Sequence, residues 1–187
     1  QEHVIEKTAA NLGIACTAFR YQNVYGPWQS LKNPYTGILT IFTQLAMAGR
    51  EIALFEDGLA TRDFVHVDDV VEFNVRALGI PGTFNVGSGH RCTLVDLAEA
   101  VAAGLGREAC FRVTGQFRLG DIRHAAADNA RLHAAFGPHD FIPLRHGVKT
   151  FTDWVGAHGD GTGANERFDA SLREMASAGM LRQAGKP

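Results

Sequence analysis

The spacing of apolar residues predicts that helices and strands alternate along most of the chain. Apolar residues recur at the helical interval in residues 2–11, 38–48, 68–78, 93–105 and 144–155. Short apolar runs between these segments predict strands at residues 14–19, 52–55, 64–66, 83–86 and 110–113. Residues 14–19 are almost uninterrupted in apolar character, which is typical of a strand whose two faces are both covered by helices. The pattern therefore predicts an α/β fold with a parallel sheet.

Turn and capping residues mark the ends of several of these segments. Gly13 and Gly49 follow helical segments, where glycine commonly ends a helix. Thr93 and Asp96 have the spacing of a capping box, and Asp128 is placed to cap a short helix. No capping residue precedes residues 2–11, so we expect the chain to begin inside a helix.

Other segments lack a clear period. Residues 20–37 and 114–124 are expected to be long loops, and long loops inside compact domains are usually functional. Residues 156–165 are expected to be a linker. Residues 168–181 are amphipathic, and two outcomes stay open for them: docking on the rest of the chain, or remaining mobile.

Composition narrows the class of protein. The chain has 187 residues, of which 45% are hydrophobic and 20% are charged, which is ordinary for a folded domain. A formal net charge of -2 gives no electrostatic reason to expect nucleic acid or an acidic membrane as a partner. No apolar run is long enough to span a membrane. The widely spaced cysteines form no Cys-x-x-Cys pair, so a reducing cytoplasm is the expected compartment.

Three motifs carry the candidate chemistry. Residues 20–27 read RYQNVYGP, residues 57–70 read DGLATRDFVHVDDV, and residues 118–123 read RLGDIR with Asp128 following. In this order, they resemble the motifs of the NAD-dependent nucleotide-sugar epimerases and dehydratases of the extended short-chain dehydrogenase/reductase family. Residues 33–39 resemble the loop of bacterial 4-epimerases, including the dTDP-rhamnose and UDP-glucose types.

The resemblance implies a fold and a division of the chain. It implies the C-terminal portion of a Rossmann-like enzyme, with the end of the parallel sheet and a small α/β substrate-binding domain. Residues 1–37 would be the tail of the cofactor domain with its substrate loop. Residues 38–157 would be mainly the sugar-nucleotide-binding region, with returns to the Rossmann sheet. Residues 158–187 would be a linker and a C-terminal amphipathic helix.

The resemblance also implies how the diphosphate of the ligand is held. Arg62 and Arg118 would bind it, and Asn23 would donate a hydrogen bond to the substrate. The chemistry suits this role, because a buried diphosphate needs fixed cations and the arginine side chain donates two parallel hydrogen bonds. The alternative for Arg62 is a surface salt bridge with Asp63 or Asp57.

Apolar residues match the family's positions around the nucleotide base. Each of them is equally consistent with a role in the core, because apolar residues at regular spacing are usually buried. The candidates are Ile38, Leu39, Ala53, Phe55 and Phe64.

The resemblance implies a cofactor contact for one polar residue, whereas other polar residues invite roles that the sequence does not favour. Tyr21 lies where the family's chain passes the nicotinamide, so the resemblance implies a contact with the cofactor. Tyr25 belongs to a structural Tyr-Gly-Pro motif in the family and is assigned no proton transfer. His66, Asp68 and Asp69 resemble a metal cluster, but the two aspartates are better explained as charges at a helix N-terminus. No metal site is expected.

Motifs needed for catalysis are missing from the sequence. The Gly-x-Gly at Gly87 and Gly89 has Cys92 where a dinucleotide-binding motif needs its third glycine, so it is interpreted as a structural turn. In the family, a glycine-rich turn binds NAD and a Tyr-x-x-x-Lys pair transfers the proton, and neither motif occurs here. We therefore expect no catalytic residue in this chain, with NAD bound mainly by an N-terminal half that precedes it.

The function expected on this basis is the nucleotide-sugar-binding part of an NAD-dependent NDP-hexose 4-epimerase, inactive by itself. The ligand would be a dTDP- or UDP-hexose, and the complete enzyme would form a homodimer. Two alternatives stay open: part of a 4,6-dehydratase, and a sugar-nucleotide-binding or assembly module without catalysis.

Overall fold

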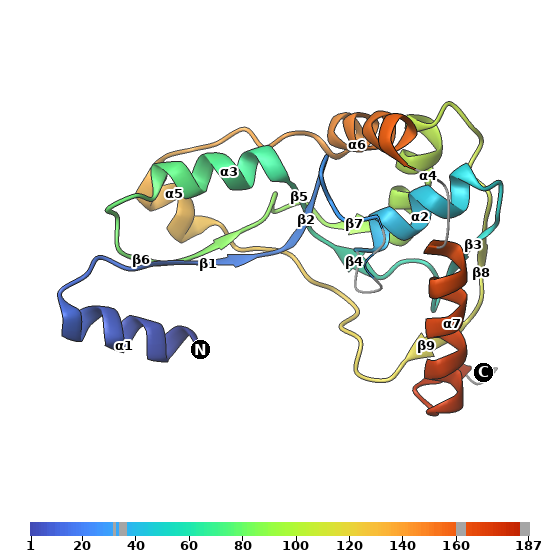
Figure 1. Cartoon of the computed structure of the whole chain (residues 1–187), viewed down its shortest axis with the longest axis horizontal. Helices are drawn as coiled ribbons and strands as arrows, with labels where there is room; N and C mark the ends of the chain where they lie inside the picture. The colour runs from blue at the N-terminus through green and yellow to red at the C-terminus, as the bar shows by residue number, and fades with distance from the viewer. Residues whose placement is uncertain (32, 34–36, 160–163, 184–187) are drawn as a thin grey trace.

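The structure, a computed structural model, describes residues 1–31, 33, 37–159 and 164–183. Helices and strands alternate along most of its length, as Figure 1 shows. The helices are α1 (Glu2–Leu12), α2 (Ile38–Met47), α3 (Val67–Arg76), α4 (Leu94–Gly104), α5 (Ala130–Phe136), α6 (Leu144–His158) and α7 (Ala164–Ser177). The strands are β1 (Thr17–Tyr21), β2 (Asn23–Tyr25), β3 (Ile52–Leu54), β4 (Thr61–Arg62), β5 (Phe64–His66), β6 (Gly82–Val86), β7 (Cys92–Thr93), β8 (Phe111–Val113), β9 (Gln116–Arg118) and β10 (Leu181–Gln183).

Within the described residues, the strands pair in twos. The pairs β1–β6, β2–β5 and β3–β8 are parallel, whereas β4–β7 and β9–β10 are antiparallel. Parallel pairs need a crossover connection, and helices α2 and α3 lie in these connections. The predicted α/β class with parallel pairing is confirmed.

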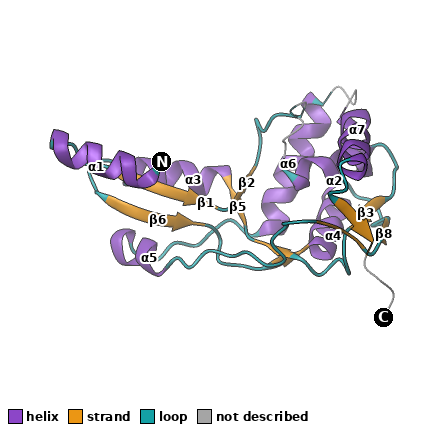
Figure 2. Cartoon of the chain, turned by 90° about the horizontal axis from the view of Figure 1, so that it is seen from below, coloured by secondary structure: helices purple, strands orange, loops and turns teal. Residues whose placement is uncertain are grey.

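The elements form two lobes, which the views of Figure 1 and Figure 2 separate. We call α1, β1, β6, α3 and α5 the sheet lobe. We call α2, α4, α6, α7 and the strands β3, β4, β7, β8, β9 and β10 the cavity lobe. Each lobe has its own cluster of buried apolar side chains.

The strand pair β2–β5 lies between the two lobes and contributes to both cores. Successive side chains of a strand point to opposite faces of the sheet. Tyr25 and Phe64 therefore pack in the core of the cavity lobe, whereas Val24 and Val65 pack in the core of the sheet lobe. The predicted strand at residues 64–66 is confirmed. Because its side chains point alternately into the two cores, this strand connects the two lobes.

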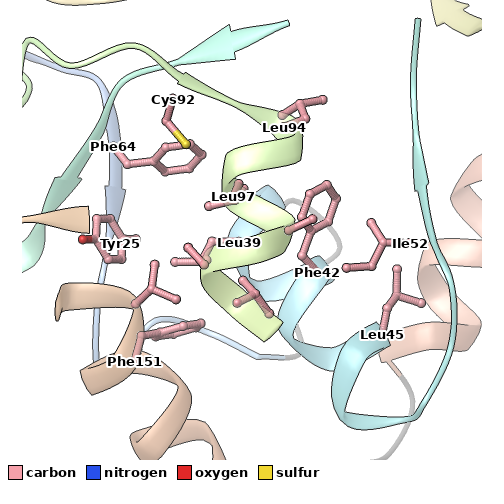
Figure 3. Close-up of a cluster of buried hydrophobic side chains, with 14 of the residues drawn as sticks. Tyr25, Leu39, Phe42, Leu45, Ile52, Phe64, Cys92, Leu94, Leu97 and Phe151 are labelled. Carbon is pink, nitrogen blue, oxygen red and sulfur yellow. The ribbon is translucent and has the colours of Figure 1, made fainter. Parts of the chain in front are cut away.

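The core of the cavity lobe is shown in Figure 3. Leu97 of α4 and Phe151 of α6 are fully buried, and Leu39 and Phe42 of α2 pack beside them. These side chains come from three helices, each with apolar residues on one face. The cluster fixes the positions of the helices around the cavity described below.

Local capping chemistry sets several helix ends. The Thr93 hydroxyl accepts from the Asp96 amide at 3.0 Å and the Asp96 carboxylate accepts from the Thr93 amide at 3.0 Å, so the capping box is confirmed. Gly13 is left-handed, with φ 66°, and ends α1 as predicted. The Ile14 amide donates to the carbonyl of Ala9 at 2.9 Å, which completes the helix stop.

The prediction of a strand at residues 14–19 was wrong at its start. Ile14 follows the Gly13 cap of α1 and is 60% exposed, and β1 begins only at Thr17. The predicted burial of both faces is not present in the described residues, where β1 is half-buried at its start and exposed at its end.

Both predicted long loops contain a strand. Residues 20–37 include β2, and residues 114–124 include β9. The strands that pair with them, β5 and β10, lie far along the chain, so no local pattern identifies β2 and β9 as strands. The predicted linker at residues 156–165 is also too long, because α6 continues to His158 and α7 begins at Ala164.

The predicted cap of α5 is displaced by one residue. Asn129 occupies the N-cap position and makes no capping hydrogen bond with its side chain. Asp128, the predicted cap, precedes it and accepts from the Ala130 amide at 2.9 Å. The carboxylate therefore satisfies a helix N-terminal amide from outside the cap position.

Candidate functional site

A cavity of about 940 Å³ lies in the cavity lobe. Its walls come from segments that are distant in the sequence: the start of β2, helix α2, the end of β3, strand β4, strand β9 with the loop after it, and helix α7. Six of the eight predicted substrate-binding residues line it: Asn23, Ile38, Ala53, Phe55, Arg62 and Arg118. The fold therefore brings together the residues of all three sequence motifs.

Arg62 is half-buried at the end of β4. Its Nη1 donates to the carbonyl oxygens of Thr61 at 2.9 Å and Arg123 at 3.2 Å. Over the described part of the chain, no carboxylate lies within 4.0 Å of the guanidinium, so the alternative of a salt bridge with Asp63 or Asp57 is not what the structure shows. The guanidinium is held by backbone from one side and keeps its charge available to an anion.

Arg118, at the end of β9, is held more loosely. Its Nε lies 3.6 Å from a carboxylate oxygen of Asp121 and is buried without a hydrogen bond within the described residues. Both side chains are about 40% exposed, at 39% and 40%. A pair of this kind contributes little to stability, so an incoming anion can replace Asp121 at small cost.

Asn23 occupies the boundary between the lobes. Its backbone amide donates to the Asp63 carbonyl at 2.9 Å, and its partner in the parallel register is Phe64. Arg62 immediately precedes Asp63, so this hydrogen bond places the first and second motifs side by side. The apolar cavity residues Ala53 and Phe55 come from β3 and the residue after it.

The two remaining predicted residues line a smaller neighbouring cavity of about 370 Å³. Leu39 and Phe64 contribute to it, and Asn23 and Ile38 line both cavities. Leu39 and Phe64 are also members of the buried core, at 1% and 5% exposure. Each therefore packs in the core and also lines a cavity, so neither of the two roles left open for them is ruled out.

Tyr25 packs as a core residue. Its ring makes edge contacts with Phe64 and His66, and its hydroxyl faces Gly147 of α6, where a methyl group would clash. Burial raises the pKa of the Tyr25 hydroxyl well above its usual value, with a smaller contribution from Asp69. A phenol that resists ionisation is a poor proton acceptor near neutral pH, which agrees with the structural role expected for it.

Tyr21, the candidate cofactor contact, lies apart from both cavities. It is the last residue of β1 and is 42% exposed, and its hydroxyl lies within hydrogen-bond distance of the Asn74 side chain of α3. Its position at the carboxyl end of a parallel strand is where ligands bind in folds of this class. The contact with NAD stays a prediction.

Asp63 explains the Gly-x-Gly turn after β6. This buried carboxylate accepts from the amides of Ser88, Gly89 and Ala127 at 2.7, 3.0 and 2.9 Å. A methyl group on Gly87 would lie 2.3 Å from the carboxylate, so only glycine fits there. The amides that a dinucleotide phosphate would need are used by a side chain of this chain, which agrees with the interpretation of a structural turn.

His66 and its aspartate neighbours have separate structural tasks. The buried His66 accepts from the Asp68 amide through Nδ1 at 3.2 Å and so caps α3. Asp69 is buried and pairs with His139 at 2.8 Å. Burial lowers the pKa of His66, which favours the neutral ring. No group of three potential metal ligands occurs in residues 1–31, 33, 37–159 and 164–183.

Sequence analysis missed a second set of site residues. Phe117 of β9 lines the cavity beside Arg118, and so do several residues of α7. Arg123 pairs with Glu56 and, at 2.6 Å, with Asp57, which lowers the pKa of Asp57. These pairs hold the loop after β9 against the turn after β3. The charged residues at 118–123 could have indicated these pairs, but they were interpreted only as part of the family motif.

Comparison with known proteins identifies the family. The model of the NAD dependent epimerase/dehydratase family matches residues 1–87. A curated dTDP-L-rhamnose 4-epimerase of Burkholderia thailandensis is 39% identical over 159 aligned residues, which cover 83% of this chain and 44% of that protein. This chain belongs to the NAD-dependent epimerase/dehydratase family.

Solved structures agree with the membership of this family. The crystal structure of a UDP-glucose 4-epimerase from Thermotoga maritima, determined with UDP-glucose, matches with a TM-score of 0.72 and 32% identity over 83% of this chain and 50% of that one. A Thermus thermophilus UDP-glucose 4-epimerase in complex with NAD matches with a TM-score of 0.73 and 26% identity over 84% of this chain and 51% of that one.

This epimerase/dehydratase chain spans about half the length of the relatives that it matches. None of the described helices is both long enough and apolar enough to cross a bilayer.

Proposed function

We propose that this chain is the nucleotide-sugar-binding part of an NAD-dependent NDP-hexose 4-epimerase, which removes hydride from C4 of the sugar and returns it to the opposite face. The observation that carries the proposal is the convergence of Arg62, Arg118 and Asn23, from three distant segments, on one cavity with apolar walls. Two of the curated relatives support it: a dTDP-L-rhamnose 4-epimerase of Burkholderia thailandensis and a UDP-glucose 4-epimerase of Mycolicibacterium smegmatis.

The electrostatics of the cavity favour a diphosphate. A diphosphate loses its hydration on entering a cleft, and only fixed cations and amide donors offset that cost. Backbone carbonyls orient the guanidinium of Arg62, and the one ion pair that Arg118 makes with a described residue is long, at 3.6 Å. Both therefore have hydrogen-bond donors left for phosphate oxygens.

The size and lining of the cavity favour a nucleotide attached to the diphosphate. A volume of about 940 Å³ is near the upper end for cavities that bind small molecules. Phe42, Phe55 and Ile41 supply apolar surface for a base, whereas Asn23 supplies an amide for a sugar hydroxyl. The smaller cavity shares Asn23, which supports a position of the sugar between the two cavities.

The residues of this chain fit NAD poorly as its main binding site. In the Gly-x-Gly turn after β6, the amides of Ser88 and Gly89 donate to Asp63, and Tyr21 is the one candidate that the motifs suggest near the cofactor. We therefore propose that residues outside this chain hold NAD, which accepts and returns hydride when bound, and supply the proton-transfer pair. The chain's own part is to bind and orient the sugar nucleotide. The homodimer and the division at residues 37 and 157 remain predictions.

Binding measurements on arginine variants test the proposal. Arg62→Ala and Arg118→Ala should each weaken the binding of a UDP- or dTDP-sugar by about 2 to 5 kcal/mol, because each removes a charge-assisted partner from a desolvated phosphate. Titration calorimetry on the protein that carries this chain, expressed from its complete reading frame, gives the affinities.

Arg112→Ala is the matched control. Arg112 is exposed, pairs with Glu51 on the surface and does not line the cavity, so its removal should leave the affinity unchanged. Wild-type affinity for both sugar nucleotides in the Arg62 and Arg118 variants would refute the assignment. Equal losses in all three variants would indicate a general charge effect and would also contradict it.

A further inference from the structure

Helix α7 forms one wall of the candidate cavity, which the sequence pattern alone did not indicate. Phe168, Ser171, Leu172 and Met175 are spaced as neighbours on one helical face, and all four line the cavity. Glu174 lines it from the edge of the same face. Figure 1 shows α7 beside α2, whose residues form the facing wall.

The segment is fixed in place at several points. Asp169 accepts two hydrogen bonds from Arg50, each 3.0 Å long, and Phe168 packs against the core of the cavity lobe. After α7, strand β10 pairs with β9, so that Leu181 lies opposite Arg118. The same chain segment therefore contributes a cavity wall and supports the strand that carries a proposed diphosphate ligand.

The walls of the cavity differ in their cations. Arg62 and Arg118 come from β4 and β9. The carboxylates of Glu56 and Asp121 also line that side, but each is paired with an arginine. Helix α7 lines the cavity with no cation and with one carboxylate, that of Glu174, which has no ion pair within the described residues. A carboxylate repels a diphosphate, so an anionic group gains more at the arginines than beside α7. The uncharged part of the ligand should face the helix.

We propose that α7 contacts the nucleoside of the sugar nucleotide. Phe168, Leu172 and Met175 give one apolar wall for the base, opposite Ile41 and Phe42 of α2. A planar base between two such walls buries apolar area on both of its faces.

The polar residues of α7 complete this assignment. The Ser171 hydroxyl and the Glu174 carboxylate make no side-chain hydrogen bond within the described residues, and both line the cavity. They can pair with hydroxyl or amide groups of a ribose or a base edge. The inference rests on the proposed function and names the part of the chain that would select the nucleotide.

A pair of serine variants on the same helix tests the inference. Ser171→Trp places a large ring in the cavity, whereas Ser177→Trp makes the same change at an exposed position that does not line it. With UDP and dTDP as probes, Ser171→Trp should raise the Kd at least tenfold, which corresponds to about 1.4 kcal/mol. Ser177→Trp should bind as the wild type does.

The outcomes separate this inference from the proposed function. A wild-type protein that binds neither UDP nor dTDP contradicts the proposed function. Tight binding by the wild type together with unchanged binding by Ser171→Trp refutes the role of α7 alone. Equal unfolding midpoints of the two variants show that the loss is not a folding defect.

Hydrogen exchange on the wild-type protein tests the inference without a substitution that could disturb folding. Adding UDP or dTDP should slow amide exchange in residues 168–177 as well as around Arg62 and Arg118. Slower exchange at the arginines without any change in residues 168–177 would overturn the proposal, whether or not Ser171→Trp folds.

Discussion

The two lobes differ in how completely their helices are covered. In the cavity lobe, no large apolar residue of α2, α4 or α6 is exposed. In the sheet lobe, α1 has no buried residue, and its Val4, Ile5 and Leu12 are 55% to 66% exposed. Helix α3 buries one face on the sheet and exposes Val71 and Val75 on the other, and Leu78 just after it is also exposed.

This difference indicates which lobe is stabilised by contacts within the chain and which lobe exposes apolar surface. The cavity lobe encloses the larger core and holds most of the proposed ligand-binding residues, so its helices are stabilised from within the chain. The described residues leave apolar faces of the sheet lobe open to solvent, and contiguous exposed apolar surface favours association. We expect binding to depend on the first lobe and good solution behaviour to be limited by the second.

The largest expected effect is the complete loss of turnover when residues 1–187 are expressed alone. The proton-transfer pair expected for the family is absent from the sequence, and its loss removes the chemical step even when binding persists. The assay supplies NAD with UDP-galactose or dTDP-rhamnose and follows the product and the monomer fraction. A soluble monomer that epimerises either sugar would disprove the prediction and require an acid/base among Tyr21, Tyr25 and His66.

The next effect concerns the junction of the lobes. Asp63→Ala should lower the free energy of unfolding by about 3 to 5 kcal/mol, because it removes the buried carboxylate that accepts from the amides of Ser88, Gly89 and Ala127. Urea unfolding measures the change. Asp57→Asn, at an exposed carboxylate, is the control and should behave nearly as the wild type. A similar small change for Asp63→Ala would show that the junction does not depend on this carboxylate.

A pair of leucine variants compares the helices of the two lobes directly. Leu97→Ala, in the core of the cavity lobe, should cost about 2 to 5 kcal/mol, since the side chain is fully buried. Leu78, just after α3 in the sheet lobe, is 81% exposed, and Leu78→Ala should change stability by less than about 0.5 kcal/mol. Comparable losses in the two variants would mean that the sheet lobe is covered in solution by something that the described residues do not include.

The smallest effect is a pH dependence from His66. Burial lowers its folded-state pKa below 6.5, so the unfolded chain binds a proton more readily. Stability from the neutral ring is therefore present above pH 6.5 and is lost as the pH falls through the folded-state pKa. The slope is at most about 1.4 kcal/mol per pH unit. His66→Asn should remove this part of the slope between pH 7.5 and 5.5, and an unchanged slope would assign the dependence to other histidines.

Sequence analysis predicted the elements whose signals are local. The Gly13 helix stop and the Thr93–Asp96 capping box depend on neighbours within a few residues, and both are confirmed. The candidate site was predictable to the extent that motifs identify residues: Arg62, Arg118 and Asn23 come together as expected. Leu39 and Phe64 were undecided because an apolar residue beside a cavity has the same pattern as one in a core.

The sequence by itself determined the α/β class, most helix ends and which polar residues are candidates, because those properties follow from local spacing and side-chain chemistry. Tertiary structure alone decided that residues 23–25 and 116–118 are strands, since each is too short to be stable without a partner from a distant segment. It also decided that Asp63 is a buried acceptor and that α7 is a cavity wall. Both depend on contacts between residues far apart in the chain, which only the folded arrangement brings together.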